Sequence, residues 1–177
     1  GRGKALFPGL INCHAHLTAT LERGFNEDFG FPNSAPLKVR PASLLRGDEA
    51  ALMVTVGALE AIRTGTTTFV ENAGGIDRYA SALAKTGLRW VFAESIRDSE
   101  NVPGPLSPDG FAKSERPAFS ARLRDEGLQK ISDLFSAWHG TNNGRISVFP
   151  AAALTETSSP ELLQAVRTFA EKHDLGY

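Results

Sequence analysis

The sequence contains a single cysteine, Cys13, among its 177 residues. One cysteine excludes an intrachain disulfide and favours a reducing compartment, so we expect a cytoplasmic protein. No apolar run approaches the roughly 20 residues that cross a bilayer, so we expect no membrane partner. The 19 basic and 20 acidic residues give a formal net charge of −1. This balance, without a run of lysine and arginine, predicts no nucleic-acid partner.

The sequence motifs of two other enzyme classes are also missing. No GxGxxG follows the first predicted strand and no GxxxxGK occurs anywhere, so a nucleotide-binding sheet has little support. There is no GxSxG segment, and no Ser-His-Asp arrangement can be argued from spacing. The chemistry must therefore come from other residues.

Apolar segments of strand type alternate along the chain with segments of helical periodicity. The predicted strands are 5–17, 66–70, 88–93 and 145–149, and the predicted helices are about 48–64, 76–85, 118–139 and 159–175. Four such units without hairpin signals predict an α/β fold, in which helices cover a parallel sheet. Segments 18–46 and 99–117 are predicted loops, and we expect the first to fold over a pocket.

Two local patterns describe the helices more closely. In the first helix, apolar residues recur with a helical period and are expected to form its buried stripe: Leu52, Val56, Leu59 and Ile62. Ser158 with Glu161 three residues later matches a capping box for the last helix, and Pro160 fits its first turn.

The first predicted strand ends in two histidines separated by one residue, His14 and His16. Alternate side chains on a strand share a face, so both imidazoles should point the same way, with Cα atoms about 6.6 Å apart. Two imidazoles at this spacing can bind one metal ion at about 2.0–2.1 Å each. Cys13 should face the other way and pack in the core, and it is not expected to be a nucleophile.

Three segments carry a resemblance to a known family. Pro8–His16 resembles the strand-one motif of the amidohydrolase superfamily, whose members are metal-dependent hydrolases on a (β/α)8 barrel. Glu60–Phe69 resembles the helix-to-strand-two junction of the branch that contains the cytosine, guanine and adenosylhomocysteine deaminases and the triazine chlorohydrolases. Ser159–Leu163, followed by Phe169–Gly176, resembles the helix after strand four of that branch.

The resemblance implies a metal-dependent aminohydrolase or chlorohydrolase with a TIM-type barrel, of which residues 1–177 are a partial domain of about four β/α units. His14 and His16 match the two strand-one ligands of one divalent metal ion, with zinc expected and iron as the alternative. The metal-activated water would attack a nitrogen heterocycle such as a purine, pyrimidine or triazine. Segments 18–46 and 99–117 would form the pocket walls, at the C-terminal ends of the strands.

The chain departs from the family in its length. The remaining ligands, two histidines and an aspartate, would lie beyond Tyr177, and two histidines fall short of the three protein ligands that a catalytic zinc usually has. His139 and His173 end amphipathic helices, where a histidine is favoured electrostatically, so they are not expected to substitute. We therefore expect the N-terminal half of a hydrolase, inactive alone.

Polar residues near the strand ends are the candidates for substrate binding, and they are Glu71, Asn72, Glu94, Thr155 and Glu156. The two glutamates fit either a pocket role, as substrate contacts or as support for a ligand histidine, or a salt bridge or solvated strand end. Arg97 and Asp98 have weaker cases. Pro150 is followed by alanines where adenosylhomocysteine deaminases carry a histidine, which argues against that substrate.

Two alternatives stay open. The first is a cyclic amide hydrolase with the same ligands but a binuclear site bridged by a modified lysine. The second is a non-catalytic half-barrel that acts as a binding or assembly protein, because half a barrel exposes two sheet edges and an apolar face. The second alternative predicts a stable oligomer and no stoichiometric metal.

Overall fold

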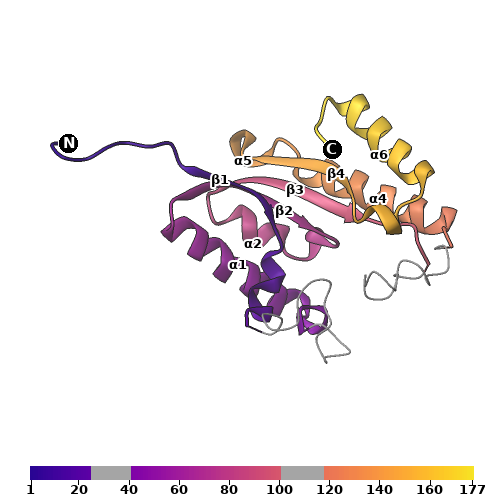
Figure 1. The fold of residues 1–177 in the computed structure, drawn as a ribbon, viewed down its shortest axis with the longest axis horizontal. Coiled ribbons are helices and arrows are strands. Elements are labelled where there is room, and N and C mark those ends of the chain that lie inside the picture. Colours follow the sequence, from indigo (N-terminus) through magenta and orange to yellow (C-terminus); the bar gives the residue numbers. More distant parts are fainter. Residues whose placement is uncertain (25–40, 101–117) are drawn as a thin grey trace.

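The computed structural model describes residues 1–24, 41–100 and 118–177. Four strands form one parallel sheet in the order of the sequence, which confirms the predicted α/β architecture (Figure 1). The strands are β1 (Leu10–Ala15), β2 (Thr66–Ala73), β3 (Arg89–Ile96) and β4 (Ile146–Ala152). Among the described residues, β1 and β4 are the edges of this sheet.

Helices follow the strands in turn. They are α1 (Gly47–Arg63), α2 (Ala80–Ala84), α4 (Ala121–Trp138), the short α5 (Thr141–Gly144) and α6 (Pro160–His173). The short 3-10 helices are η1 (Leu17–Glu22), η2 (Pro41–Leu44), η3 (Ile76–Arg78) and η4 (Thr155–Thr157). The predicted helix 76–85 is thus divided at Tyr79, whose backbone is not helical. The rest of the predicted loops 18–46 and 99–117 lies outside the described residues.

One face of the sheet carries the core. Alternate residues of β2, β3 and β4 are buried against the helices, among them Phe69, Trp90 and Val148. Their neighbours on the opposite face, such as Val70 and Val91, are only half-buried. Because side chains alternate along a strand, this difference shows which face the helices cover.

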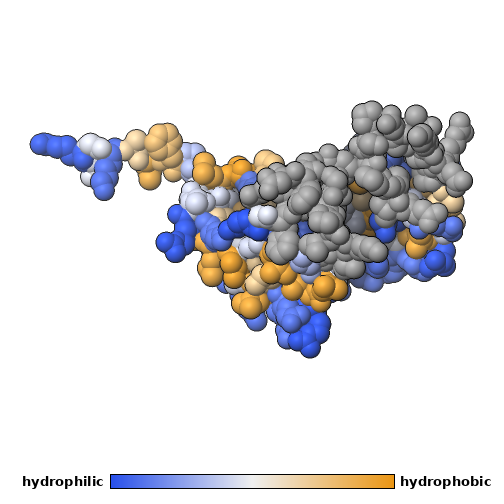
Figure 2. Space-filling model, turned by 60° about the horizontal axis from the view of Figure 1, so that its bottom comes forward, coloured by the Kyte–Doolittle hydropathy of each residue, from blue (hydrophilic) through white to orange (hydrophobic). Residues whose placement is uncertain are grey.

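The predicted burial of α1 is wrong. Its apolar stripe is exposed, at 59% for Leu52, 36% for Val56, 51% for Leu59 and 39% for Ile62. The helix instead buries a face of small residues: Ala50, Val54, Gly57 and Ala58. Hydrophobic residues accordingly gather on the surface around this helix (Figure 2).

A close approach of backbones explains the small residues of α1. A Cβ atom on Gly57 would lie 2.7 Å from Thr20 Oγ1 and 2.9 Å from Leu17 Cδ2. Only glycine therefore lets the helix pack directly on the η1 turn that follows β1. Larger residues have to face away from this contact.

The last helix begins one residue later than the capping-box pattern predicts. Ser159 is the N-cap, and its Oγ accepts a hydrogen bond from Leu162 N at 3.0 Å. Pro160 occupies the first turn, as predicted. Ser158 Oγ is buried and has no hydrogen-bond partner among the described residues. No helix in the described ranges is long and apolar enough to cross a membrane.

Candidate metal centre

His14 and His16 meet at the end of β1, as their spacing predicts. Their Nε2 atoms lie 3.1 Å apart, and the ring centroids are 4.7 Å apart with the planes at 87°. Ala15, between them, packs against the core, so the two imidazoles lie on the face that the helices do not cover. Both histidines are exposed.

A hydrogen bond to the neighbouring strand orients the imidazole of His16, and a local bond holds the backbone of His14. His16 Nδ1 is bonded to the backbone carbonyl of Asn72 on β2, which can only accept. Nδ1 therefore carries the proton, and Nε2 keeps its lone pair for a ligand. The backbone N–H of His14 donates to Asn12 Oδ1 at 3.0 Å. A metal-binding histidine usually donates the N–H of its other ring nitrogen to a carbonyl or carboxylate, as His16 does here.

The two Nε2 atoms fit a divalent metal ion. With bonds of about 2.0–2.1 Å, a separation of 3.1 Å corresponds to an angle of about 98° at the metal. This angle suits two neighbouring ligands of a zinc ion. No group of three His, Cys, Asp or Glu residues able to hold a metal occurs in the ranges that the structure describes.

Glu71 lies on the opposite side of the sheet from the predicted pocket. Its carboxylate is fully buried and accepts from Leu17 N, at 3.2 Å to Oε1 and 3.0 Å to Oε2, and from Tyr79 Oη at 3.0 Å. Burial raises its pKa to about 7, against the lowering effect of the hydrogen bonds from Leu17 and Tyr79. Among the residues that the structure describes, the carboxylate has no salt-bridge partner, and it contacts Leu17, the residue that follows His16.

Glu94 on β3 is buried between the sheet and the helices, as Glu71 is on β2. Its Oε1 accepts from Gly75 N at 2.6 Å and its Oε2 from Ile76 N at 3.0 Å, so it holds the turn between β2 and η3. Burial raises the pKa of this carboxyl, and the hydrogen bonds from Gly75 and Ile76 oppose the rise. Glu71 and Glu94 are therefore both buried on the helix-covered face of the sheet, on the opposite side from His14 and His16.

The other predicted substrate contacts lie on the strand ends. Asn72 supplies its backbone carbonyl to His16, and Thr155 and Glu156 lie in η4, directly after β4. Thr155 is exposed and Glu156 is half-buried. Contact with substrate stays a prediction for Asn72, Thr155 and Glu156.

The other two histidines, His139 and His173, pack against aromatic side chains. His139 Nδ1 accepts from Val148 N at 3.2 Å, and its ring stacks on Phe135 at 4.3 Å. His173 packs at 4.5 Å from the same phenylalanine ring. These contacts agree with the structural role predicted for both. Cys13, predicted to pack in the core, is exposed instead, on edge strand β1.

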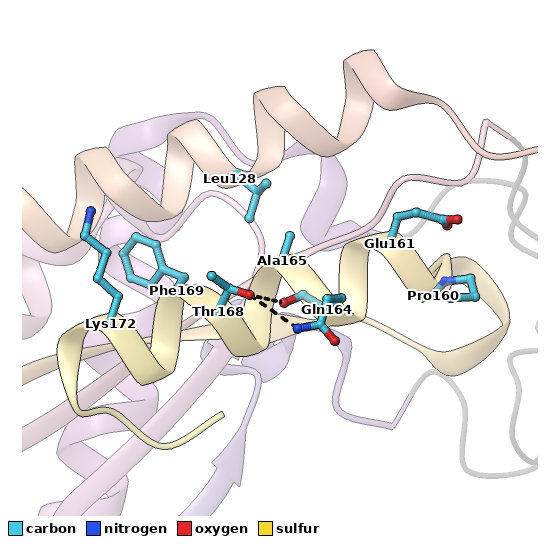
Figure 3. A pocket seen from close by; sticks show the side chains of 8 residues that line it. All are labelled: Leu128, Pro160, Glu161, Gln164, Ala165, Thr168, Phe169 and Lys172. Atoms are coloured by element: carbon cyan, nitrogen blue, oxygen red, sulfur yellow. Dashed lines mark hydrogen bonds between the residues drawn. The ribbon is translucent and has the colours of Figure 1, made fainter.

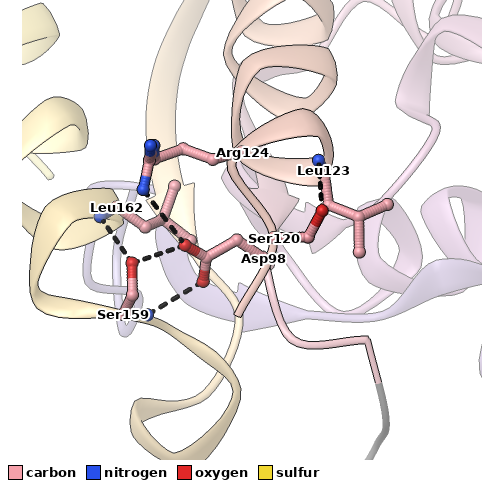
Figure 4. Close-up of polar contacts among 6 residues, drawn as sticks. All are labelled: Asp98, Ser120, Leu123, Arg124, Ser159 and Leu162. Atoms are coloured by element: carbon pink, nitrogen blue, oxygen red, sulfur yellow. Dashed lines mark hydrogen bonds and ion pairs between the residues drawn. The ribbon is translucent and has the colours of Figure 1, made fainter. Parts of the chain in front are cut away.

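Asp98 is a buried residue whose role the sequence did not indicate. Its Oδ1 accepts from Ser159 N at 2.8 Å, its Oδ2 accepts from Ser159 Oγ, and Arg124 Nη1 lies 3.9 Å from Oδ2 (Figure 4). The backbone of Asp98 also accepts from Ser120 N at 2.8 Å. Asp98 thus joins the end of β3 to the first turns of α4 and α6.

A groove of about 770 Å³ lies on the outer side of the molecule, between α4 and α6 (Figure 3). Its lining includes Leu128, Ala165 and Phe169, with Lys172 at one end and Glu161 at the other. Neither histidine of the candidate centre lines it. Volume alone therefore does not identify the reactive site, which needs convergent polar groups as well.

The buried carboxyls predict a stability that falls as the pH rises. An unfolded chain ionises Glu71 near the ordinary value of 4.5, whereas the folded chain ionises it near 7. Between these values the folded state binds more protons, so the free energy of unfolding should decrease by up to about 3 kcal/mol and level off above 7. Urea unfolding at a series of pH values measures this. Glu71→Gln should flatten the decrease, and an unchanged slope in that variant would contradict the assignment.

Comparisons with known proteins agree with this architecture. The Amidohydrolase family profile matches residues 5–177. A 5'-deoxyadenosine deaminase from Methanothermobacter thermautotrophicus is 31% identical over 176 residues, which are 99% of this chain and 37% of the relative. The chain thus spans little more than a third of that relative's length.

Two solved structures share the fold. A guanine deaminase from C. acetobutylicum, with guanine bound in its active site, superposes with a TM-score of 0.72 at 17% identity, over 95% of this chain and 38% of its own. An atrazine chlorohydrolase from Arthrobacter aurescens, complexed with zinc, superposes with a TM-score of 0.66 at 20% identity, over 95% and 39%.

Proposed function

Because this chain belongs to the amidohydrolase family, we propose that it contributes two metal ligands to a hydrolase that acts on a nitrogen heterocycle. The observation that carries the proposal is the convergence of His14 Nε2 and His16 Nε2 at 3.1 Å, with His16 Nδ1 held by a backbone carbonyl. The relatives favour purine nucleosides, purines or triazines as the substrate class, since a deoxyadenosine deaminase, a guanine deaminase and an atrazine chlorohydrolase are among them.

In this proposal, the residues of this chain bind the metal ion and orient its ligands and the substrate. His14 and His16 would hold one divalent ion through Nε2, with zinc favoured by the zinc complex of the atrazine chlorohydrolase. When bound, such an ion lowers the pKa of a coordinated water, so that hydroxide forms near neutral pH. The carbonyl of Asn72 keeps the His16 proton on Nδ1, so Nε2 stays available as a ligand. Asn72, Thr155 and Glu156, at the ends of β2 and β4, are the proposed contacts with the heterocycle.

We further propose that residues 1–177 are the N-terminal half of the barrel and that turnover needs ligands outside them. Two imidazoles leave a catalytic zinc one protein ligand short of the usual three. Sequencing the reading frame beyond the codon for Tyr177 tests this directly. Further strands that carry two histidines and then an aspartate are the expected result, and an immediate stop codon would contradict it.

The activity itself is tested by product analysis on the protein from its complete reading frame, loaded with zinc. Release of ammonia from adenosine-type nucleosides or guanine, or of chloride from a chlorotriazine, is the expected result. Ring opening of a cyclic amide without either product would favour the cyclic amide hydrolase instead.

The exposed stripe of α1 and the edge strands favour one further candidate, a binding or assembly protein without catalysis. Two results together would favour this candidate over the hydrolase. They are a stable homo-oligomer in size-exclusion chromatography and the absence of stoichiometric zinc.

A further inference from the structure

We propose that Glu71, supported by Tyr79, is a positioning residue that fixes His16 in the orientation in which its Nε2 can bind a metal ion. The inference rests on the proposed function, because it assigns a role to Glu71 at that same centre. Glu71 contacts neither metal nor substrate in this role. It acts through the backbone amide of Leu17.

The first step is the bond to the peptide that follows His16. Leu17 N lies 3.2 Å from Glu71 Oε1 and 3.0 Å from Oε2, so one N–H is shared by both oxygens. β1 ends at Ala15, and the sheet ladder therefore does not hold this amide. The side chain of Glu71 accepts the hydrogen bond of this amide in place of a neighbouring strand, and it fixes the plane of the peptide between His16 and Leu17.

The second step is the bond to the imidazole itself. Asn72, the neighbour of Glu71 in β2, accepts from His16 Nδ1 through its carbonyl. Two consecutive residues of β2 therefore hold His16, one through its ring and one through the following amide. A rotation of that peptide would move the ring away from the carbonyl, and the Nδ1 proton would lose its acceptor.

The third step is the support of the carboxylate. Tyr79 is 1% exposed, and its hydroxyl donates to Glu71 Oε1 at 3.0 Å. On the other side of the same segment, Gly57 of α1 packs against Leu17, which is 6% exposed. Leu17 is thus held through its side chain by α1 and through its amide by the hydrogen-bonded carboxylate.

A buried carboxylate in the layer between sheet and helices is costly, and an apolar residue there would usually be at least as stable. Glu94 is the matched case on β3, since it is also buried and accepts two backbone N–H groups. Its partners belong to the turn after β2, and no hydrogen bond between described residues joins Gly75 or Ile76 to β1. The two glutamates therefore differ in what they hold, which separates positioning from general stability.

The test compares Glu71→Met with Glu94→Met, since methionine keeps the shape of the side chain but accepts no strong hydrogen bond. In the metal-free chain at mildly alkaline pH, the ¹⁵N shifts of His16 report which ring nitrogen carries the proton. We expect the Nδ1–H tautomer in the wild type and in Glu94→Met, and a mixture of tautomers in Glu71→Met. Glu71→Gln, whose amide oxygen can still accept from Leu17 N, should restore the wild-type spectrum. Should Glu71→Met fail to fold, Glu71→Asp, which is one methylene too short to reach Leu17 N, replaces it with the same expectation.

Zinc affinity of the same variants, made in the complete protein and measured by competition with a chelator, is the second readout. Glu71→Met should weaken binding about 10–100-fold, the usual cost of losing an outer partner, while Glu94→Met keeps the wild-type affinity. An Nδ1–H tautomer that persists in a folded Glu71→Met, or equal losses of affinity in both methionine variants, would overturn the positioning role. A wild-type protein that shows the tautomer but binds no zinc would instead overturn the proposed metal centre.

Discussion

Replacing either His14 or His16 with alanine is expected to abolish both bound zinc and turnover in the complete protein. The two Nε2 atoms lie 3.1 Å apart, so each variant removes one of the two proposed ligands and leaves the other imidazole without its partner. The loss should exceed the 10–100-fold that removal of an outer hydrogen-bond partner costs. Metal analysis of the purified protein and the rate of ammonia or chloride release measure the two effects together.

His139→Ala and His173→Ala are the matched controls for this experiment. Both histidines pack on the ring of Phe135. These variants should keep the full zinc content, although packing is lost. Full activity in His14→Ala or in His16→Ala would refute the metal centre.

The second large effect concerns the joint made by Asp98. Asp98→Ala should lower the free energy of unfolding by roughly 3 kcal/mol, because Ser159 N and Ser159 Oγ lose their acceptor in a buried position. For a chain of this size, that corresponds to a fall in Tm of roughly 6–12 °C. Thermal unfolding of the metal-free chain measures it. Asp98→Asn, which keeps one acceptor for Ser159 N, should lie between the alanine variant and the wild type.

Glu126→Ala provides the comparison for an exposed acidic residue. Glu126 forms an ion pair with Arg122 at 2.7 Å within α4, and the glutamate side chain is 51% exposed. Exposed pairs of this kind contribute little, so the Tm should hardly change. An Asp98→Ala variant that unfolds at the temperature of Glu126→Ala would show that the joint is not a stabilising element.

Local patterns in the sequence determined the strands and helices of this protein and the common face of His14 and His16. Alternation along a strand is a local rule, so the common face of His14 and His16 follows from their spacing alone. The order of strand and helix segments likewise predicted the parallel sheet, which the structure confirms. The proline at position 160 marked the first turn of α6 for the same reason, since its φ angle is set within the residue.

Only the tertiary structure decided which helix faces are buried and which groups form hydrogen bonds with the buried acidic residues Glu71 and Asp98. The stripe of α1 obeys the helical period, but the close approach of Gly57 to Leu17 turned the small residues inward and the larger ones outward. Glu71 and Leu17 are 54 residues apart in sequence, and Asp98 and Ser159 are 61 apart. Contacts at such separations depend on how the strands pair and the helices pack, so local sequence patterns do not predict them.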